Sequence, residues 1–174
     1  LKCHLRTLIE LETKPVVHAP ALGDCGVCHD PHATDHPAIL RSDPETVCME
    51  CHADVVHAAH EATTQHAAVT TKRACLNCHA PHASDHTALL TRDVRELCFE
   101  CHNQPIPMKD GTTLVNMKKL MEGGRTLHGA VTQRGCVECH EIHGGGHRRL
   151  LTNEYPSDLY YPFASKATPR IRHF

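Results

Sequence analysis

Residues 25–52 constrain the fold of this chain more than any other stretch, because their pattern returns twice. Two CxxCH motifs, at 25–29 and 48–52, flank a further histidine and an apolar pair, Ile39-Leu40. The whole pattern recurs over 75–102, and its first half recurs over 136–151. A fixed period of this kind indicates one supersecondary unit repeated in an array. We therefore expect a row of small units rather than one domain around a single core.

Three chemistries use cysteine pairs at this spacing: disulfides, a four-cysteine zinc site and covalently attached haem. Eleven cysteines cannot all pair with one another. Zinc gives no reason for a histidine directly after the second cysteine, yet all five complete motifs have one. On a helical turn the two sulfurs of CxxCH face one porphyrin, and the histidine at the next position faces its iron. The motifs therefore predict c-type haem.

The predicted sites number five, with a sixth at the chain start, where Cys3-His4 has the form of the end of another CxxCH. Either the chain continues before Leu1, or a haem there is held by one thioether. The cysteines expected to form thioether bonds are Cys3, Cys25, Cys28, Cys48, Cys51, Cys75, Cys78, Cys98, Cys101, Cys136 and Cys139. The histidines expected as proximal iron ligands are His4, His29, His52, His79, His102 and His140.

Two further classes of histidine recur with the repeat and are predicted to be distal ligands, so that every iron is bis-histidine. The first class precedes the leading motif of each unit and consists of His18, His66 and His128. The second class follows the proximal histidine of the leading motif by three residues and consists of His32, His82 and His143. A ligand so close to one proximal histidine is expected to bind the neighbouring iron. This cross-ligation would pull adjacent haems together.

A rival third class recurs four residues later, at His36, His86 and His147. If that segment is helical, both histidines share a face and only one of each pair reaches an iron; we favour the first. His57, His60 and His173 have no repeat partners and are expected at the surface or beside ligands. The methionines at 108, 117 and 121 are expected to be core filler, the last two on a helix that also carries Leu114 and Leu120 and ends at Gly123-Gly124.

Composition agrees with a haem-filled interior, since the chain has no Trp and only 3% aromatic residues. The fold class expected is mostly irregular, with short α-helices and little or no β structure. Asp43 or Ser42 is expected to cap the helix that carries the second motif of the first unit, and Asp93 the corresponding helix of the second unit. Residues 54–66 are expected to form a helix that bridges the two units. The chain is expected to divide as follows. Residues 1–17 are the end of a preceding unit, and 18–60 and 61–110 are two-haem units. Residues 111–151 are a helix with a one-haem unit, and 152–174 are an extended tail.

The unit His-x-Pro…CxxCH-x-Pro-His…Leu-Leu…CxxCH resembles the doubled-CxxCH multihaem cytochromes. These include the decahaem conduits of outer-membrane porin–cytochrome complexes and the pentahaem electron donor of nitrite reductase. The resemblance covers 18–52 and 66–102 well and 124–151 in part. It implies low-potential bis-histidine haems stacked into a wire, in a protein that resides in the periplasm or at the cell surface.

The function expected is electron transfer as part of a respiratory or extracellular assembly; the alternatives are a soluble periplasmic shuttle and a multihaem oxidoreductase with one open haem. An enzyme is disfavoured for two reasons. Multihaem nitrite reductases characteristically use a Lys-ligated CxxCK site, and no motif here ends in Lys. Enzymes similar to hydroxylamine oxidoreductase cross-link a Tyr to a haem, and the three tyrosines here all lie in the tail. Redox proteins are the expected partners, and the aromatic and basic tail either straps the chain's own haems or docks a membrane complex or a second copy. With a net charge of −2 the chain lacks the excess of basic residues that is typical of nucleic-acid-binding proteins. No apolar run reaches transmembrane length.

Overall fold

The computed structural model describes residues 3–124, 126–133 and 135–154. The α-helices in these residues are α1 (Leu5–Thr13), α2 (Pro44–Glu61), α3 (Val94–Phe99), α4 (Met117–Gly123) and α5 (Gly129–Gln133). The strands are β1 (Val16–Val17), β2 (Thr64–Gln65), β3 (Ala83–Ser84), β4 (Ile106–Pro107), β5 (Thr113–Leu114) and β6 (Gly144–Gly145). Short 3-10 turns supply most of the remaining regular structure: Ala19–Leu22, Cys25–Val27, Pro37–Ile39, Ala67–Thr70, Ala74–Asn77, Thr87–Leu89, Cys136–Glu138 and Arg148–Leu150.

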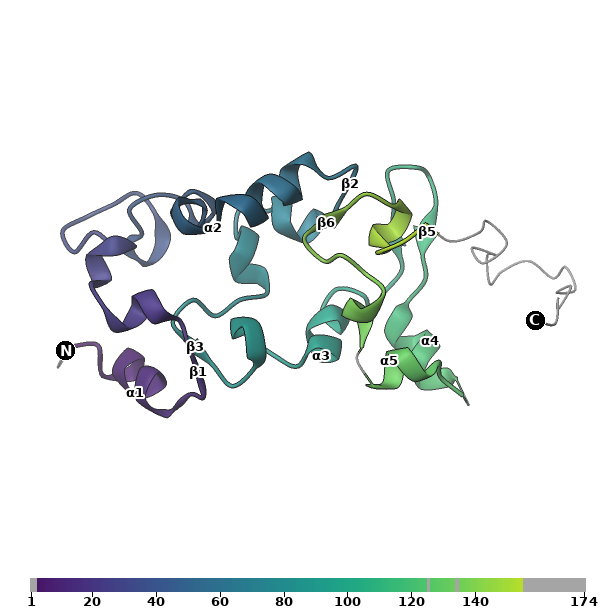
Figure 1. Ribbon diagram of the computed structural model, residues 1–174, viewed down its shortest axis with the longest axis horizontal. Coiled ribbons are helices and arrows are strands. Elements are labelled where there is room, and N and C mark those ends of the chain that lie inside the picture. The colour runs from purple at the N-terminus through teal and green to yellow at the C-terminus, as the bar shows by residue number, and fades with distance from the viewer. Residues whose placement is uncertain (1–2, 125, 134, 155–174) are drawn as a thin grey trace, which may run out of the picture.

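The described residues form an elongated body with α1 at one end and α4 and α5 towards the other (Figure 1). Side-chain packing is sparse, because no large side chain in this part of the chain is fully buried. The buried apolar residues are Val56, Ala59, Ala74, Ala83 and Leu90. The expected fold class, mostly irregular with short helices and few strands, is confirmed. A polypeptide with so small a core needs something other than side chains to hold its segments together.

Successive units are joined by short antiparallel strand pairs. The strand that opens the first unit, β1, pairs with β3 of the second, so that Val16 lies opposite Ser84. The strand that opens the second unit, β2, pairs in the same register with β6 of the third, Thr64 opposite Gly145. The same junction is therefore built twice, and each unit rests on the one that follows it.

The second motif of each complete unit begins on an α-helix with a carboxylate cap. The side chain of Asp43 accepts a hydrogen bond from the backbone N–H of Thr46, with Pro44 in the first turn of α2. The side chain of Asp93 caps α3 by accepting from the backbone N–H of Arg95. α2 bends at His52 and continues to Glu61. The bridging helix expected over 54–66 is therefore a continuation of the motif helix, and it gives way to β2 at Thr64.

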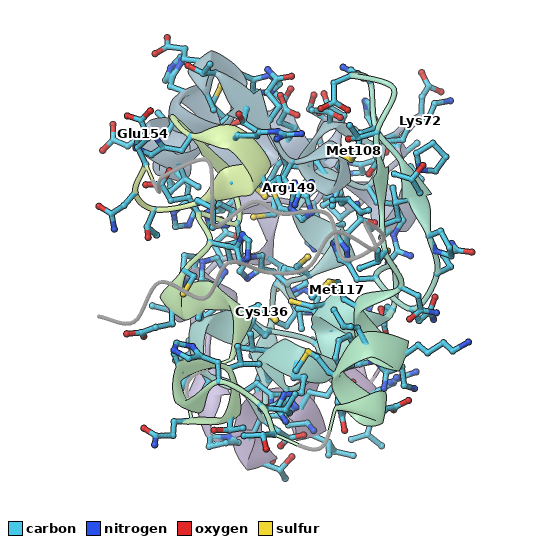
Figure 2. All side chains as sticks on the ribbon, turned by 90° about the vertical axis from the view of Figure 1, so that its right-hand side faces the viewer. Lys72, Met108, Met117, Cys136, Arg149 and Glu154 are labelled. Atoms are coloured by element: carbon cyan, nitrogen blue, oxygen red, sulfur yellow. The ribbon has the colours of Figure 1, made fainter. Side chains whose placement is uncertain are left out.

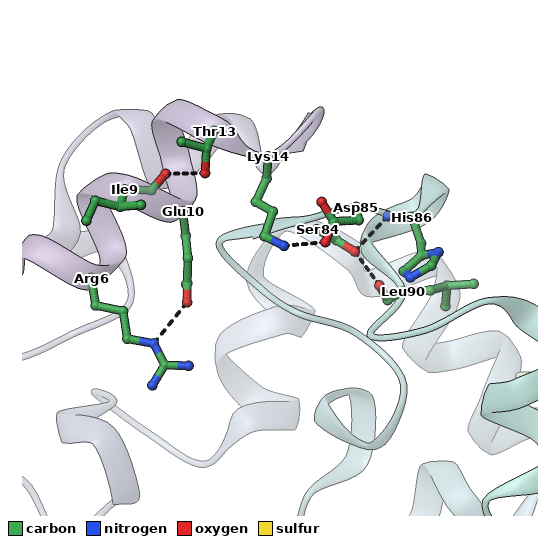
Figure 3. Close-up of polar contacts among 9 residues, drawn as sticks. All are labelled: Arg6, Ile9, Glu10, Thr13, Lys14, Ser84, Asp85, His86 and Leu90. Atoms are coloured by element: carbon green, nitrogen blue, oxygen red, sulfur yellow. Dashed lines mark hydrogen bonds and ion pairs between the residues drawn. The ribbon is translucent and has the colours of Figure 1, made fainter.

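α1 packs against β3 of the second unit (Figure 3). Lys14, directly after the helix, forms an ion pair with Asp85. Beside it, the hydroxyl of Ser84 donates to the carbonyl of Leu90 and accepts from the backbone N–H of His86 at 3.0 Å. These contacts tie the first residues of the chain to the loop that carries β3.

The segment between the second and third units is a β-hairpin followed by a helix. β4 pairs with β5, and Asn116 caps α4 by accepting from the backbone N–H of Lys119 at 2.8 Å. Leu114 lies in β5, outside the helix on which we expected it, and Met117 begins α4. Within the described ranges no helix is both long and apolar enough to cross a membrane. The tail expected over 152–174 lies outside the described residues from Tyr155 onwards.

Candidate haem-binding sites

All eleven cysteines lie in the described residues, and all are free thiols. Three or more His, Cys, Asp or Glu side chains are nowhere grouped to hold a bare metal ion in the part of the chain that the structure describes. The arrangement therefore supports neither a disulfide framework nor a four-cysteine zinc site. It leaves the thiols available for thioether bonds.

The three leading motifs share one local structure that aims the proximal imidazole. Each begins on a 3-10 turn, and its histidine then bridges back to the second leucine of the apolar pair: His29 to Leu40, His79 to Leu90, and His140 to Leu151. The ring Nδ1 of each histidine lies within hydrogen-bond distance of a backbone carbonyl oxygen nine residues later. The partners are Ala38 for His29 at 2.9 Å, Ala88 for His79 at 2.8 Å and Arg149 for His140 at 2.9 Å. An Nδ1–H that donates to a carbonyl leaves Nε2 free as a metal ligand.

The carbonyls that hold these rings come from strained backbone. Ala38, Ala88 and Arg149 all have φ between 53° and 59°, and the residue after each is left-handed as well. Side-chain-bearing residues rarely adopt this conformation, and such strain concentrates at functional sites. The sequence showed only a recurring apolar pair at this place. Nothing in its composition signals two consecutive left-handed residues, because glycine, the usual occupant, is absent.

Four pairs of imidazoles face one another, each joining a CxxCH histidine to a histidine outside any motif. Within a unit, His18 faces His52 at 6.1 Å between ring centroids, and His66 faces His102 at 6.4 Å. Between units, His82 faces His29 at 5.9 Å, and His143 faces His79 at 6.2 Å. Four of the six histidines expected as distal ligands therefore lie opposite a proximal histidine. Two of them reach into the preceding unit.

These separations fit an iron between the rings. Two metal–nitrogen bonds of about 2 Å, with about 1 Å from each ring centre to its nitrogen, give a centroid separation of about 6 Å. The Nδ1 atoms of His18 and His66 lie 2.9 and 2.8 Å from the carbonyls of Pro81 and Ile142 in the next unit. This again leaves Nε2 for the metal. The residues present therefore fit a haem at each of the four places.

The electrostatics of these rings also suits ligands. Burial lowers the pKa of His82, and the nearby His29 lowers it further. Burial likewise lowers the pKa of His102, with His66 adding to the effect, and that of His143, with His79 adding to it. A lowered pKa keeps an imidazole neutral near pH 7, which is the form that binds metal.

The rival class of histidines stands apart from these pairs. The segment that carries His32 and His36 is not helical, so the premise that both share a helix face was wrong. His36, His86 and His147 each precede a 3-10 turn, and the backbone N–H of His36 donates to the hydroxyl of Thr34 at 3.0 Å. Among the described residues no imidazole faces any of the three. Their arrangement is that of turn residues.

Four of the expected ligands have no facing imidazole within the described ranges: His4, His32, His128 and His140. The His140 ring is nevertheless held by its carbonyl, as His29 and His79 are. His32 and His128 are exposed, and the side chain of His32 is 92% accessible. Of the unrepeated histidines, His60 contacts the carboxylate of Glu45 at 2.8 Å and His57 is exposed, while His173 lies outside the described residues.

The sulfurs of neighbouring units meet. A hydrogen bond between the thiols of Cys48 and Cys75 raises the pKa of Cys48 and lowers that of Cys75 to about 7. The same interaction between Cys98 and Cys136 raises the pKa of Cys98 and lowers that of Cys136 to about 7. In Figure 2, which looks along the body, Cys136 lies near the middle, and Lys72 and Glu154 lie at the periphery. The second motif of one unit is thus in contact with the leading motif of the next.

Comparison with protein families gives a match that follows the repeat. The model described as the doubled CXXCH motif matches residues 18–62, 66–106 and 128–159, which together make up more than half of the chain. The comparison with curated proteins found no match. The matched segments contain the five complete CxxCH motifs and the four facing imidazole pairs. The chain therefore belongs to the doubled-CXXCH family, the multihaem c-type cytochromes.

Proposed function

We propose that this chain carries single electrons along a row of closely spaced haems, each iron held between two histidines. Covalent haem supplies reversible one-electron chemistry, and two imidazole ligands leave no position open for a substrate. The observation that carries the proposal is the set of four facing imidazole pairs. Each pair combines one histidine from a CxxCH motif with one from a repeated position outside the motifs.

Two positions in the repeat would supply the distal ligands. The histidine that opens a unit, His18 or His66, serves the second motif of its own unit. The histidine after the leading motif, His82 or His143, serves the leading motif of the preceding unit. We also propose low reduction potentials, because a second histidine in place of methionine lowers the potential of a c-type haem.

The contacts between motifs of successive units suggest the order of transfer. α2 contacts the turn Ala74–Asn77 and α3 contacts the turn Cys136–Glu138, so the second haem of one unit would be the neighbour of the leading haem of the next. Within a unit, the two motifs are joined by the short stretch that also positions the proximal ring. Electrons would then pass the sites of His29, His52, His79, His102 and His140 in chain order.

The test is the spin state of the iron in the haem-loaded protein. Mass spectrometry of the intact chain would count the haems, and quantitative electron paramagnetic resonance (EPR) of the ferric protein would count the low-spin irons. We expect at least four low-spin haems, one for each facing pair. Fewer than this, or carbon monoxide binding at several ferrous haems, would contradict bis-histidine ligation and favour an oxidoreductase with open sites.

We place the protein outside the cytoplasm, where c-type haem is attached, in a respiratory or extracellular electron-transfer assembly. Haem propionates would add negative charge to a polypeptide that already carries −2. Docking to a basic redox partner should therefore slow as ionic strength rises. A freely diffusing periplasmic shuttle is the second candidate.

A further inference from the structure

One buried polar atom sets the junction between the second and third units apart. Among the described residues that are not exposed, the Nε of Arg95 is the one buried side-chain nitrogen or oxygen without a hydrogen-bond partner. A guanidinium is always charged and carries five N–H donors, so a buried donor without a partner costs more than the loss of an ordinary hydrogen bond. Such a donor indicates an acceptor that does not belong to the described polypeptide.

Arg95 is held in place at this junction by two helices. It lies on α3, three residues before Cys98, and its Nη2 donates to the carbonyl oxygens of Val131 at 2.7 Å and Thr132 at 3.3 Å, both on α5. α3 and α5 each contact the turn Cys136–Glu138, on which the leading motif of the third unit begins. The guanidinium is therefore fixed beside that motif, and its unpaired Nε does not belong to a loose side chain.

The charge of Arg95 is also unpaired. Four other arginines in the described part of the chain form ion pairs with carboxylates: Arg6, Arg41, Arg92 and Arg148. Arg95 forms none with the described residues, and the two carbonyls that it contacts are neutral. Arginine binds carboxylates through charge-assisted hydrogen bonds, which are about twice as strong as neutral ones. The side chain is thus suited to a carboxylate ligand.

The first junction carries the opposite charge at the corresponding position. Glu45 lies three residues before Cys48, as Arg95 lies three residues before Cys98. The Glu45 carboxylate lies 2.8 Å from the Nε2 of His60. An ionised carboxylate has no hydrogen-bond donor to offer an anion. The donor site of Arg95 therefore belongs to the second junction and is not a feature of the repeat.

These two charges act in opposite directions on the leading motif that follows each of them. A hydrogen bond with the preceding motif lowers the pKa of the Cys136 thiol, and the positive charge of Arg95 lowers it further. The same kind of hydrogen bond lowers the pKa of the Cys75 thiol, and there the charge of Glu45 opposes the effect. A positive charge that favours a thiolate also favours ferrous over ferric iron, because both changes add negative charge to the site.

The cofactor itself can supply the acceptor, since a haem attached at 136–140 carries two propionate carboxylates. We propose, on the basis of the row of haems proposed above, that Arg95 binds one of these propionates through its Nε–H and raises the reduction potential of that haem. Arg95 neutralises one carboxylate charge, and the loss of this negative charge disfavours the ferric state. Glu45 acts in the opposite sense on the haem at 75–79. The position three residues before a second motif therefore tunes the leading haem of the next unit.

The first test compares Arg95→Gln with Arg92→Gln in the haem-loaded full chain. Both variants remove one positive charge, but the Arg92 side chain is exposed and already pairs with Glu100. In a spectroelectrochemical titration, Arg95→Gln should lower the potential of one haem by about 59 mV, a tenfold change in a one-electron equilibrium. Arg92→Gln should leave all potentials close to those of the parent. Glu45→Gln should raise the potential of a different haem.

Infrared redox difference spectra test the propionate contact itself. Haem derived from δ-aminolevulinate with an isotope label at its carboxyl carbon marks the propionate bands. A labelled carboxylate band should shift in Arg95→Gln and stay in place in Arg92→Gln. The double variant Cys136→Ser, Cys139→Ser cannot attach the haem at 136–140, and it should lose the same band and the same redox step.

Two outcomes would overturn the proposal. One is an Arg95→Gln chain that keeps all the potentials of the parent. The other is a lowered potential without any change in the labelled bands, which would mean that the charge acts through space and binds no propionate. Failure here is separable from failure of the proposed function, because the count of low-spin haems by EPR tests bis-histidine ligation and does not depend on Arg95.

Discussion

The imidazole of His82 faces that of His29 at 5.9 Å, although the two residues belong to successive repeats. His82 lies only three residues after His79, the proximal histidine of its own unit. Its ring is half-buried, and it faces back across the strand pair formed by β1 and β3. A residue of one unit thereby becomes part of the site in another, and this relationship can be tested directly.

Replacing His82 with alanine should remove the second ligand of the haem at 25–29 and leave its own unit intact. We expect one haem to change from low to high spin in the ferric protein and to bind carbon monoxide when reduced. EPR and the visible spectrum report both changes. His86→Ala is the matched control and should leave the spectra unchanged; a high-spin signal from His86→Ala instead would mean that the rival class supplies the ligand.

The left-handed backbone at Ala88 should tolerate glycine and resist a β-branched side chain. Ala88→Gly should leave stability within about 1 kcal/mol of the parent, because relief of strain offsets the added chain entropy. Ala88→Val should cost about 1–2 kcal/mol more, since left-handed backbone is unfavourable for residues with a bulky Cβ. Guanidinium unfolding of the ferric protein measures both values. Equal stability of the two variants would show that the strain is absent.

Gly144 should tolerate no larger residue, because a Cβ at this position would lie 2.7 Å from the Cβ of Ala62 at the end of α2. Gly144→Val should separate β6 from β2 and move His143 away from His79. The expected result is one additional high-spin haem and a lower thermal midpoint. Gly146→Ala is the control, since a Cβ added there would meet nothing within 4 Å. Native spectra from Gly144→Val would rule out this tight junction.

Asp43 should make the stability of α2 depend on pH. Hydrogen bonds from Thr46 hold the pKa of its carboxyl below the usual value, so the charged form is favoured in the folded state. The stabilisation is complete above the unfolded pKa of about 3.9 and is lost as the pH falls through the lower folded value. Asp43→Ala should cost about 1 kcal/mol at neutral pH.

Asparagine is the informative control at this position, because it caps helices about as well as aspartate and does not titrate. Thermal melts between pH 7 and pH 3 should give Asp43→Asn a smaller loss of stability than the parent. If both fall equally, groups other than Asp43 account for the acid sensitivity.

Removing one haem should disturb the surrounding polypeptide as well as the electron path. Few of the residues that the structure describes are buried, so thioether and iron–histidine bonds are expected to hold the segments together. The double variant Cys75→Ser, Cys78→Ser should therefore lose helix content around its unit. Circular dichroism measures this loss. Native helix content would show that the polypeptide holds itself without that haem.

Much of the site could be predicted from the sequence, because haem attachment demands fixed residue types at fixed spacing. The motifs, the caps at Asp43 and Asp93 and the sparse core all follow from local rules. The sequence also separated the recurring histidine classes by counting. It favoured His82 over His86 without a structural reason, since that choice depends on the path of the chain after the motif. Our helical premise for that path was wrong.

Other features lay beyond reach because they arise from contacts between units. The sequence does not indicate that β1 pairs with β3, or that the thiols of Cys48 and Cys75 meet. It does not reveal that the carbonyl of Ala88 holds His79, since alanine is an unusual residue for left-handed backbone. The sequence offers six proximal and six distal candidates, which match in number. Only the geometry indicates that two histidines of each kind face no other imidazole among the described residues.

His82 faces His29, and His143 faces His79, across successive repeats. This arrangement bears on the order in which the two ligands of a haem become available during synthesis. A chain emerges from its N-terminus first, so on the proposed ligation a haem attached at 25–29 would wait for residue 82 before its second imidazole arrives. His18, in contrast, precedes the motif whose histidine it faces. The leading sites would therefore be the ones that stay without their second histidine for longest during biogenesis, and foreign ligands or oxidants could reach the iron in that interval.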